Sequence, residues 1–289
     1  MTVQHLWKQA VFNSIIGDII CSLYKKKGYI QMEKMFDLTG KVAVVTGGSS
    51  GLGADAALAY AKAGADVALL ARRIEKLNEV KAEIEKLGRK VVAVGCDVTD
   101  EESVKTAMQT VFDTFGHIDI LLNNAGIAVR GGVDSMSVEE WDKSFDTNVK
   151  GIFLASKYVV PHMKERGYGK IINIASVNAV VADKFDVFIR HSYNSSKAAV
   201  VGLTRGMAAS YARYGITVNA IGPALFESEM TSDTLFKSEE FLNKYNTLNP
   251  AGRPGRRGEL NGTVLYLSSD SSSYVQGQFI IVDGGGALV

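Results

Sequence analysis

Hydrophobic positions follow two alternating patterns from residue 41 onward. Short, fully apolar and β-branched runs are typical of strands buried on both faces of a sheet. Longer segments between them repeat their apolar positions at helical spacing. The predicted strands are residues 42–45, 67–70, 91–94, 118–122, 171–174, 216–221 and 279–282. The predicted helices are residues 54–63, 74–87, 104–115, 138–164, 193–214 and 260–267.

This alternation of strands and helices predicts an α/β fold. Because helical crossovers between parallel strands are right-handed, seven such strands give a Rossmann-type doubly wound parallel sheet. We expect it to form a single domain over residues 36–289. Ligands of these sheets bind at the carboxyl ends of the strands, so residues that directly follow strands are the candidates for a functional site.

Residues 1–35 precede this pattern and are predicted to be an amphipathic helical extension, because apolar residues recur at helical spacing between Leu6 and Leu23. Asp18 interrupts the apolar stretch and three lysines follow it, which is unlike a signal peptide. No apolar run reaches the ~18–20 residues that a membrane span needs. We expect the extension to contribute to assembly or to substrate access.

Charge and cysteine content exclude several classes of function. The 289 residues include 32 basic and 31 acidic side chains, so the net charge of +1 gives no reason to expect a nucleic-acid partner. The two cysteines, Cys21 and Cys96, are far apart and form no metal-ligand pattern. We therefore expect no disulfide scaffold, and we expect a cytoplasmic location.

A glycine-rich turn follows the first predicted strand. Gly47, Gly51 and Gly53 have the spacing Gly-x3-Gly-x-Gly, directly before a predicted helix. Glycines let the backbone approach a pyrophosphate, and the helix start supplies free N–H groups. The intervening Ser49, Ser50 and Leu52 are candidates for the same contacts. Taken alone, the motif is equally consistent with an ordinary strand-to-helix turn.

Tyr193 and Lys197 are the strongest candidates for catalysis. Four residues along a helix place both side chains on one face. A free phenol has a pKa of about 10, and a neighbouring ammonium group lowers that pKa toward the range of a useful acid or base. Ser176 ends the fifth predicted strand, where its hydroxyl can hold a substrate oxygen.

With the glycine-rich turn, Asn123-Asn124-Ala125-Gly126, Ser176 and Tyr193-x3-Lys197 in this order, the chain resembles the short-chain dehydrogenase/reductase family. The resemblance implies a NAD(H)- or NADP(H)-dependent oxidoreductase that interconverts a secondary alcohol and a ketone, in which Lys197 also binds the nicotinamide ribose. It implies that Asn148 holds a water connected to Lys197, that no metal is needed, and that the protein is a homotetramer.

The resemblance also implies further cofactor contacts. Asp97 and Val98 follow the third strand, where the family binds adenine. Asp97 could instead cap the next helix, although Asp100 is better placed to do so. Asn124, Ala125 and Gly126 match the segment beside the adenosine ribose, and Pro223 matches a segment that faces the nicotinamide. The family often has Pro-Gly there, whereas this chain has Pro223-Ala224.

The choice between NAD and NADP stays open in the sequence. The second strand is followed by Arg72 and Arg73 in place of the acidic residue that binds ribose hydroxyls in NAD-dependent proteins. Arg72 could pair with the 2′-phosphate of NADP or stack on adenine. Arg73 could equally be a solvated charge at the start of a helix.

Three substrate classes remain, and the apolar residues favour one of them. Residues 177–190 and the segment after Pro223 are rich in apolar side chains, which suits a lipophilic ketone such as a steroid. Chain length and the extension resemble bacterial 20β-hydroxysteroid dehydrogenases. Residues 225–230 and 250–258 resemble gluconate 5-dehydrogenases, in which a cation would bind the substrate carboxylate. We expect a hydroxysteroid dehydrogenase, then a sugar-acid reductase with Arg130, Lys184 or Arg190 as that cation, then a 3-oxoacyl reductase.

A protein that only binds the nucleotide is the non-enzymatic alternative. Such a protein would be expected to lack part of the catalytic set. Because Ser176, Tyr193 and Lys197 are all present, the sequence favours an enzyme.

Overall fold

The computed structural model describes residues 35–182, 189–228, 231 and 236–289. The helix expected in the N-terminal extension lies outside these residues. So do Lys184 and part of the apolar set expected at the substrate end, namely Phe185, Val187, Phe188, Met230 and Leu235. No helix of the described part is long and apolar enough to cross a membrane.

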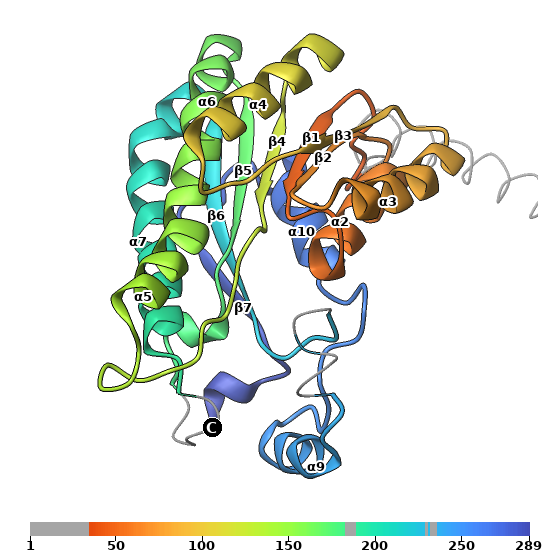
Figure 1. Cartoon of the computed structure of the whole chain (residues 1–289). Helices are drawn as coiled ribbons and strands as arrows, with labels where there is room; N and C mark the ends of the chain where they lie inside the picture. The colour runs from red at the N-terminus through yellow and green to blue at the C-terminus, as the bar shows by residue number, and fades with distance from the viewer. Residues whose placement is uncertain (1–34, 183–188, 229–230, 232–235) are drawn as a thin grey trace, which may run out of the picture. The chain divides into compact units, whose positions relative to one another are not determined.

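A sheet of seven parallel strands forms the centre of the domain, in the order β3-β2-β1-β4-β5-β6-β7 (Figure 1). This confirms the predicted doubly wound fold. The strands are β1 (Val42–Thr46), β2 (Asp66–Ala71), β3 (Val91–Gly95), β4 (Ile120–Asn123), β5 (Gly169–Ile174), β6 (Ile216–Pro223) and β7 (Phe279–Val282).

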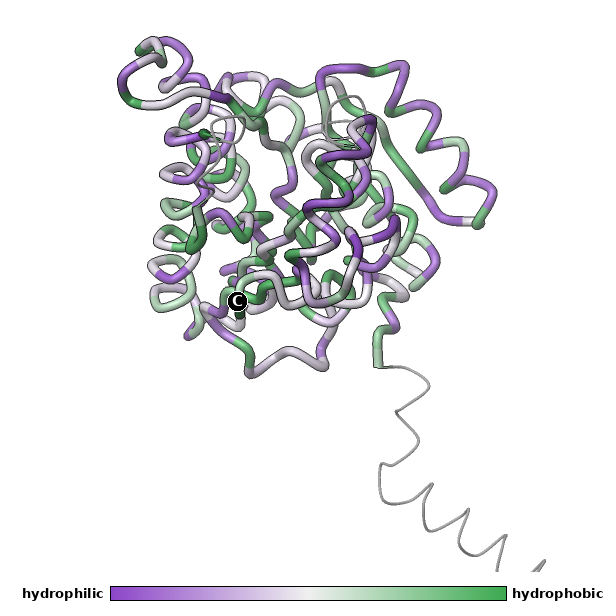
Figure 2. Tube along the Cα trace, turned by 90° about the horizontal axis from the view of Figure 1, so that it is seen from below, coloured by the Kyte–Doolittle hydropathy of each residue, from purple (hydrophilic) through white to green (hydrophobic). Residues whose placement is uncertain are grey.

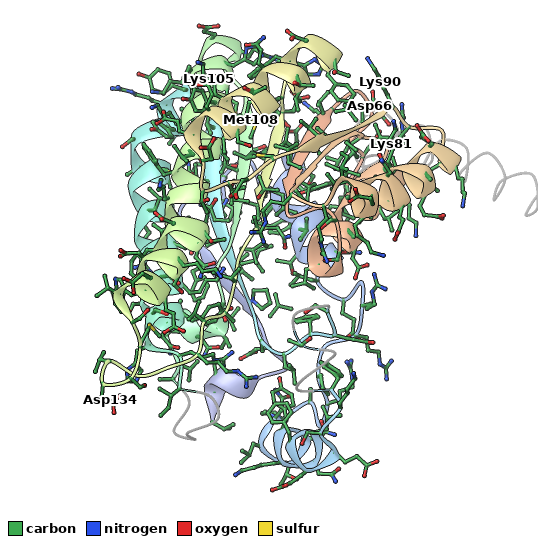
Figure 3. All side chains as sticks on the ribbon, viewed as in Figure 1. Asp66, Lys81, Lys90, Lys105, Met108 and Asp134 are labelled. Atoms are coloured by element: carbon green, nitrogen blue, oxygen red, sulfur yellow. The ribbon has the colours of Figure 1, made fainter. Side chains whose placement is uncertain are left out.

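Helices cover both faces of the sheet (Figure 1). One face carries α2 (Gly51–Lys62), α3 (Ile74–Lys86) and α10 (Asn261–Ser268). The other carries α4 (Glu101–Phe115), α6 (Gly151–Arg166) and α7 (His191–Tyr211). On α4, Met108 is buried against the sheet, whereas Lys105 is exposed (Figure 3). Hydrophobic and hydrophilic residues alternate along the turns of several helices in the Cα trace (Figure 2).

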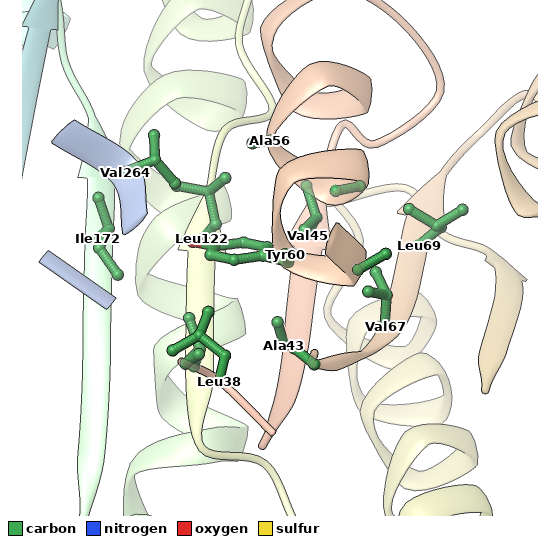
Figure 4. Packing of buried hydrophobic residues seen from close by; sticks show 14 of the residues in the cluster. Leu38, Ala43, Val45, Ala56, Tyr60, Val67, Leu69, Leu122, Ile172 and Val264 are labelled. Carbon is green, nitrogen blue, oxygen red and sulfur yellow. The ribbon is translucent and has the colours of Figure 1, made fainter. Parts of the chain in front are cut away.

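Tyr60 of α2 is the largest fully buried side chain between the first face of the sheet and its helices (Figure 4). Its ring belongs to the same core cluster as Val45, Leu122 and Val264. Its hydroxyl shares a 2.8 Å hydrogen bond with the hydroxyl of Ser268 at the end of α10, so this buried polar atom is satisfied. Burial raises the pKa of this phenol well above its usual range.

The structure refines two parts of the predicted helix pattern. The helix expected over residues 138–164 is divided into α5 (Val138–Phe145), a π-helical turn (Asp146–Lys150) and α6. Such π turns occur frequently at functional sites. A helix that the sequence pattern did not predict, α9 (Glu239–Leu248), lies in the segment after β6. Its N-cap is Ser238, whose hydroxyl accepts a 3.2 Å hydrogen bond from the Phe241 backbone N–H.

The order in which successive strands are added to the sheet reverses between β1 and β4, and this opens a crevice at the carboxyl ends of the strands. Thr46, the last residue of β1, links the two halves of the sheet there. Its hydroxyl oxygen accepts hydrogen bonds from the backbone N–H groups of Asn124 (3.0 Å) and Ala125 (3.2 Å). The predicted site residues lie at this edge because each follows, or is packed beside, the end of a strand.

Candidate active site

A cavity of about 1060 Å³ runs along the carboxyl edge of the sheet. Among the described residues that the sequence predicts for catalysis or cofactor binding, Gly53 and Asn148 are absent from its lining, and both are buried. The remaining predicted residues line the cavity: Gly47, Ser49, Ser50, Gly51, Leu52, Arg72, Asp97, Val98, Asn124, Ala125, Gly126, Ser176, Tyr193, Lys197 and Pro223.

The glycine-rich turn has no room for side chains at two of its positions. Gly47 has a φ of +66°, and a Cβ there would lie 2.9 Å from the Cα of Ala125. A Cβ on Gly53 would overlap the carbonyl oxygen of Gly47. The first turn of α2 contains no acidic residue and no capping side chain. Its N–H groups and positive end therefore remain available for an anion, which fits the pyrophosphate of a dinucleotide.

Asp97 forms the next part of the cavity wall. Its carboxylate accepts hydrogen bonds from the backbone N–H (2.9 Å) and the hydroxyl (2.8 Å) of Thr99. The backbone hydrogen bond is the main reason that the pKa of Asp97 is lowered, so the group is an ionised acceptor at neutral pH. The N-cap of α4 is Asp100, as predicted, and Asp97 is not needed for that role.

Arg72 and Arg73 both line the cavity, beyond the end of β2. Arg73 also donates a 3.3 Å hydrogen bond from Nη2 to the hydroxyl oxygen of Ser50 in the glycine-rich turn. The sequence left Arg73 open as a solvated helix-start charge. Its contact with Ser50 instead brings a second cation to the end of the cavity where Arg72 lies.

Ser176, Tyr193 and Lys197 meet at the other end of the cavity. Lys197 is only 4% exposed, and its Nζ donates a 2.9 Å hydrogen bond to the carbonyl oxygen of Ile174. Its Nζ lies 5.7 Å from the centre of the Tyr193 ring. Burial lowers the pKa of Lys197 to about 8. Burial also raises the pKa of Tyr193, while a hydrogen bond with Ser176 and the charge of Arg190 act in the lowering direction.

Asn148 lies in the π-helical turn and is fully buried. Its Oδ1 accepts a 2.8 Å hydrogen bond from the backbone N–H of Ile127. Its Nδ2 donates to the carbonyl oxygen of Ile127 (2.9 Å) and to the hydroxyl of Ser196 (3.0 Å). Ser196 in turn donates to the carbonyl oxygen of Tyr193 at 2.9 Å. Ser196, which the sequence analysis did not single out, therefore connects Asn148 to the turn that carries Tyr193.

Arg190 stands beside the catalytic candidates. Its guanidinium carbon lies 5.4 Å from the centre of the Tyr193 ring, and its Nη2 donates a 3.5 Å hydrogen bond to Oδ1 of Asn178. Asn178 Oδ1 also accepts from the Ser176 hydroxyl at 3.4 Å. A parallel bridge pairs the backbone of Arg190 with that of Gly131, next to Arg130, which also lines the cavity. The sequence analysis missed Asn178, because only the folded chain brings it to Arg190.

The apolar residues expected at the substrate end divide into two groups. Leu225 and Phe226 are only 9% and 5% exposed, and Phe226 belongs to the core cluster that contains Leu260. Phe226 therefore packs the segment onto its own domain, and both side chains also line the cavity. Val181 and Leu248 line the cavity but are 37% and 59% exposed, so they are available to a ligand.

No group of three or more histidine, cysteine or acidic side chains with a metal-binding arrangement is found among the residues that the structure describes.

Comparisons with known proteins agree with this geometry. The model of the short chain dehydrogenase family matches residues 41–238. A gluconate 5-dehydrogenase of Gluconobacter oxydans (strain 621H) is 39% identical over 251 residues, which is 87% of this chain and 96% of that protein. A 3-oxoacyl-[acyl-carrier-protein] reductase of Thermotoga maritima (strain ATCC 43589 / DSM 3109 / JCM 10099 / NBRC 100826 / MSB8) is 36% identical over 249 residues, covering 86% of this chain and 98% of that protein.

Among solved structures, a gluconate 5-dehydrogenase from Burkholderia cenocepacia J2315 in complex with NADP and tartrate superposes with a TM-score of 0.83. The two chains are 35% identical, and the match covers 89% of this chain and 98% of that one. None of these three relatives is named as a hydroxysteroid dehydrogenase. With the glycine-rich turn, the Ser176–Tyr193–Lys197 cluster and these matches in agreement, the chain belongs to the short-chain dehydrogenase/reductase family and is an NAD(P)(H)-dependent oxidoreductase.

Proposed function

We propose that the enzyme reduces the ketone of a sugar acid, or oxidises the corresponding secondary alcohol. The observation that carries this proposal is the position of Arg190, beside Tyr193 and within hydrogen-bond reach of Asn178. A guanidinium group at that place suits a substrate whose carboxylate lies a few atoms from its reacting carbonyl. The likeness to proteins named gluconate 5-dehydrogenase supports the same substrate class.

In this proposal, Tyr193 donates the proton to the ketone oxygen during reduction and removes it during oxidation. The bound cofactor supplies or accepts the hydride at the substrate carbon. The Ser176 hydroxyl holds the reacting oxygen as negative charge develops on it. Lys197 stabilises the phenolate of Tyr193 by its positive charge and also binds the nicotinamide ribose. Asn148, fixed through Ser196 and Ile127, holds the water that exchanges protons with Lys197.

A lipophilic ketone such as a steroid is the second candidate. The exposed side chains of Val181 and Leu248 on the cavity wall favour it, because they would be covered by an apolar ligand. Leu225 and Phe226 also line the cavity and remain part of its apolar wall, although Phe226 is packed against the domain core as well.

The two candidates are separated by reduced-nicotinamide oxidation with 5-ketogluconate and with cortisol, using the wild type, Arg190→Gln and Arg190→Lys. Loss of one charged hydrogen bond corresponds to a fall in kcat/KM on the order of 10- to 100-fold. We expect that loss for 5-ketogluconate in Arg190→Gln, with partial recovery in Arg190→Lys. Arg213→Gln, an exposed change on the same helical stretch, is the matched control. Cortisol reduction without 5-ketogluconate reduction would overturn the sugar-acid proposal.

We further propose a preference for NADP(H). Arg72 and Arg73 both line the same end of the cavity, and Arg73 is held against the glycine-rich turn by Ser50. Two guanidinium groups suit a 2′-phosphate better than ribose hydroxyls.

We also propose that the protein is a cytoplasmic homotetramer and that residues 1–35 contribute to assembly or to substrate access. Light scattering on the full chain and on a variant that begins at Met35 tests it, because a tetramer that is unchanged in size and kinetics after the deletion would remove the proposed role of the extension.

A further inference from the structure

Asp55 and Arg257 form an ion pair between the helix after the glycine-rich turn and the end of the segment that follows β6. Arg257 Nη2 lies 2.5 Å from Oδ1 of Asp55, and Nε lies 3.2 Å from Oδ2. Asn261 of α10 also donates a 3.3 Å hydrogen bond to the backbone carbonyl of Asp55. The contact joins residues 202 positions apart in the chain.

The carboxylate of Asp55 occupies an electrostatically unfavourable position for a cofactor-binding helix. Asp55 is the fifth residue of α2, one turn from the N–H groups that face the cavity, and its side chain is only 10% exposed. Water therefore screens its charge poorly. A carboxylate placed there opposes the binding of a pyrophosphate at the start of α2, unless a cation offsets it.

Arg257 supplies that cation from the end of the segment that follows β6. Its side chain is 59% exposed, so its charge costs little desolvation. Two residues earlier, Gly255 pairs with Phe226 in a parallel bridge, and its N–H donates a 2.9 Å hydrogen bond to the carbonyl oxygen of Leu225. Arg257 also experiences the charge of Glu227, the residue after Phe226. The Arg257 guanidinium group thus contacts α2, and the backbone just before Arg257 is hydrogen-bonded to the start of the segment that follows β6.

We infer that Arg257 is a positioning residue for cofactor binding: it neutralises Asp55 beside the pyrophosphate site and joins α2 to the segment between β6 and α10. This inference concerns the cofactor, so it does not depend on whether the substrate is a sugar acid.

The test is the Kd of NADPH, measured by nicotinamide fluorescence on the full chain without substrate. Removing one charge near a bound phosphate in partly buried surroundings corresponds to a change on the order of tenfold. We expect Arg257→Gln to raise the Kd by that factor. Asp55→Asn, which removes the opposing charge, should bind NADPH at least as tightly as the wild type. The double variant Asp55→Asn/Arg257→Gln should return to within about twofold of the wild type.

Arg256→Gln is the matched control, since Arg256 is an exposed neighbour whose removal changes the net charge equally. Equal weakening by Arg256→Gln and Arg257→Gln would overturn the inference in favour of a general charge effect. Weaker NADPH binding by Asp55→Asn would overturn it in favour of a purely structural ion pair. Thermal unfolding of each variant identifies loss of folding, and the prediction for Asp55→Asn holds even if Arg257→Gln does not fold.

Discussion

The Nζ of Lys197 lies 5.7 Å from the centre of the Tyr193 phenol ring. The same Nζ donates a hydrogen bond to the carbonyl oxygen of Ile174. The ammonium group is thus held by a backbone oxygen at the end of β5, rather than by a carboxylate. A carboxylate partner would have neutralised its charge. A carbonyl partner fixes its position and leaves the positive charge available to the phenol.

Replacing Tyr193 with Phe removes only the hydroxyl that is proposed to transfer the proton. We expect kcat to fall by roughly 10²–10⁴-fold, the range of a lost general acid. The Kd of NADPH should stay within about twofold of the wild type. Stopped-flow reduction and fluorescence titration measure the two quantities, and an active Tyr193→Phe enzyme would refute the assignment.

Replacing Lys197 with Met should abolish turnover and stabilise the fold near neutral pH. The difference between the usual pKa of 10.5 and the value of about 8 in the folded chain corresponds to about 3 kcal/mol. The lost hydrogen bond to Ile174 offsets about 1 kcal/mol of this gain. Urea unfolding of the cofactor-free protein should therefore give a net stabilisation of about 2 kcal/mol.

The pH dependence of this stabilisation has a definite sign. Between about pH 8 and 10.5 the unfolded chain keeps the Lys197 proton that the folded chain has lost. The wild type therefore becomes more stable relative to Lys197→Met as pH rises through this window, and the difference is constant below it. We therefore expect the extra stability of Lys197→Met over the wild type to shrink with rising pH. An increase of that extra stability with pH would contradict the position of Lys197 as a buried, poorly solvated amine.

Ser196 and Asn148 should act as one unit. Ser196→Ala removes a hydrogen-bond partner of the Asn148 amide without touching the cavity wall. We expect a several-fold fall in kcat with little change in the Kd of NADPH. In a double-mutant cycle, Ser196→Ala should add almost nothing to Asn148→Ala, because contacting residues in one network are not additive. Fully additive losses would show that the two residues act separately.

Replacing Arg72 or Arg73 with Gln should change cofactor preference more than catalysis. Each change removes a charged donor proposed to bind the 2′-phosphate, which corresponds to a fall in kcat/KM for NADPH on the order of tenfold. The kcat/KM for NADH should stay within about twofold of the wild type. The readout is therefore the ratio of kcat/KM for NADPH to kcat/KM for NADH. A wild type that prefers NADH would contradict the proposal before any variant is made.

The sequence predicted the fold and most of the site because both depend on local patterns. Strands such as β1 and β5 are buried on both faces and rich in Val or Ile. The glycine-rich turn and Ser176 come at the ends of these strands, and Tyr193-x3-Lys197 lies at the beginning of a helix. The contacts of Arg190 with Asn178 and of Arg257 with Asp55 join segments that no periodicity relates. The helix α9 was missed because the apolar residues of its segment were interpreted as a substrate wall and not as one face of a helix.

One part of the wall at the substrate end is a continuous stretch of chain between Pro223, which ends β6, and Leu260, which precedes α10. It pairs with itself where Phe226 meets Gly255, and none of its described residues belongs to the seven-stranded sheet. If this stretch selects the substrate, exchange of residues 224–254 between relatives would alter ligand choice and would leave Arg257, Ser176 after β5, and Tyr193 and Lys197 on α7 in place. The catalytic candidates and this segment therefore lie in separate parts of the chain. The segment can change in sequence, and specificity with it, while the core of the domain stays the same.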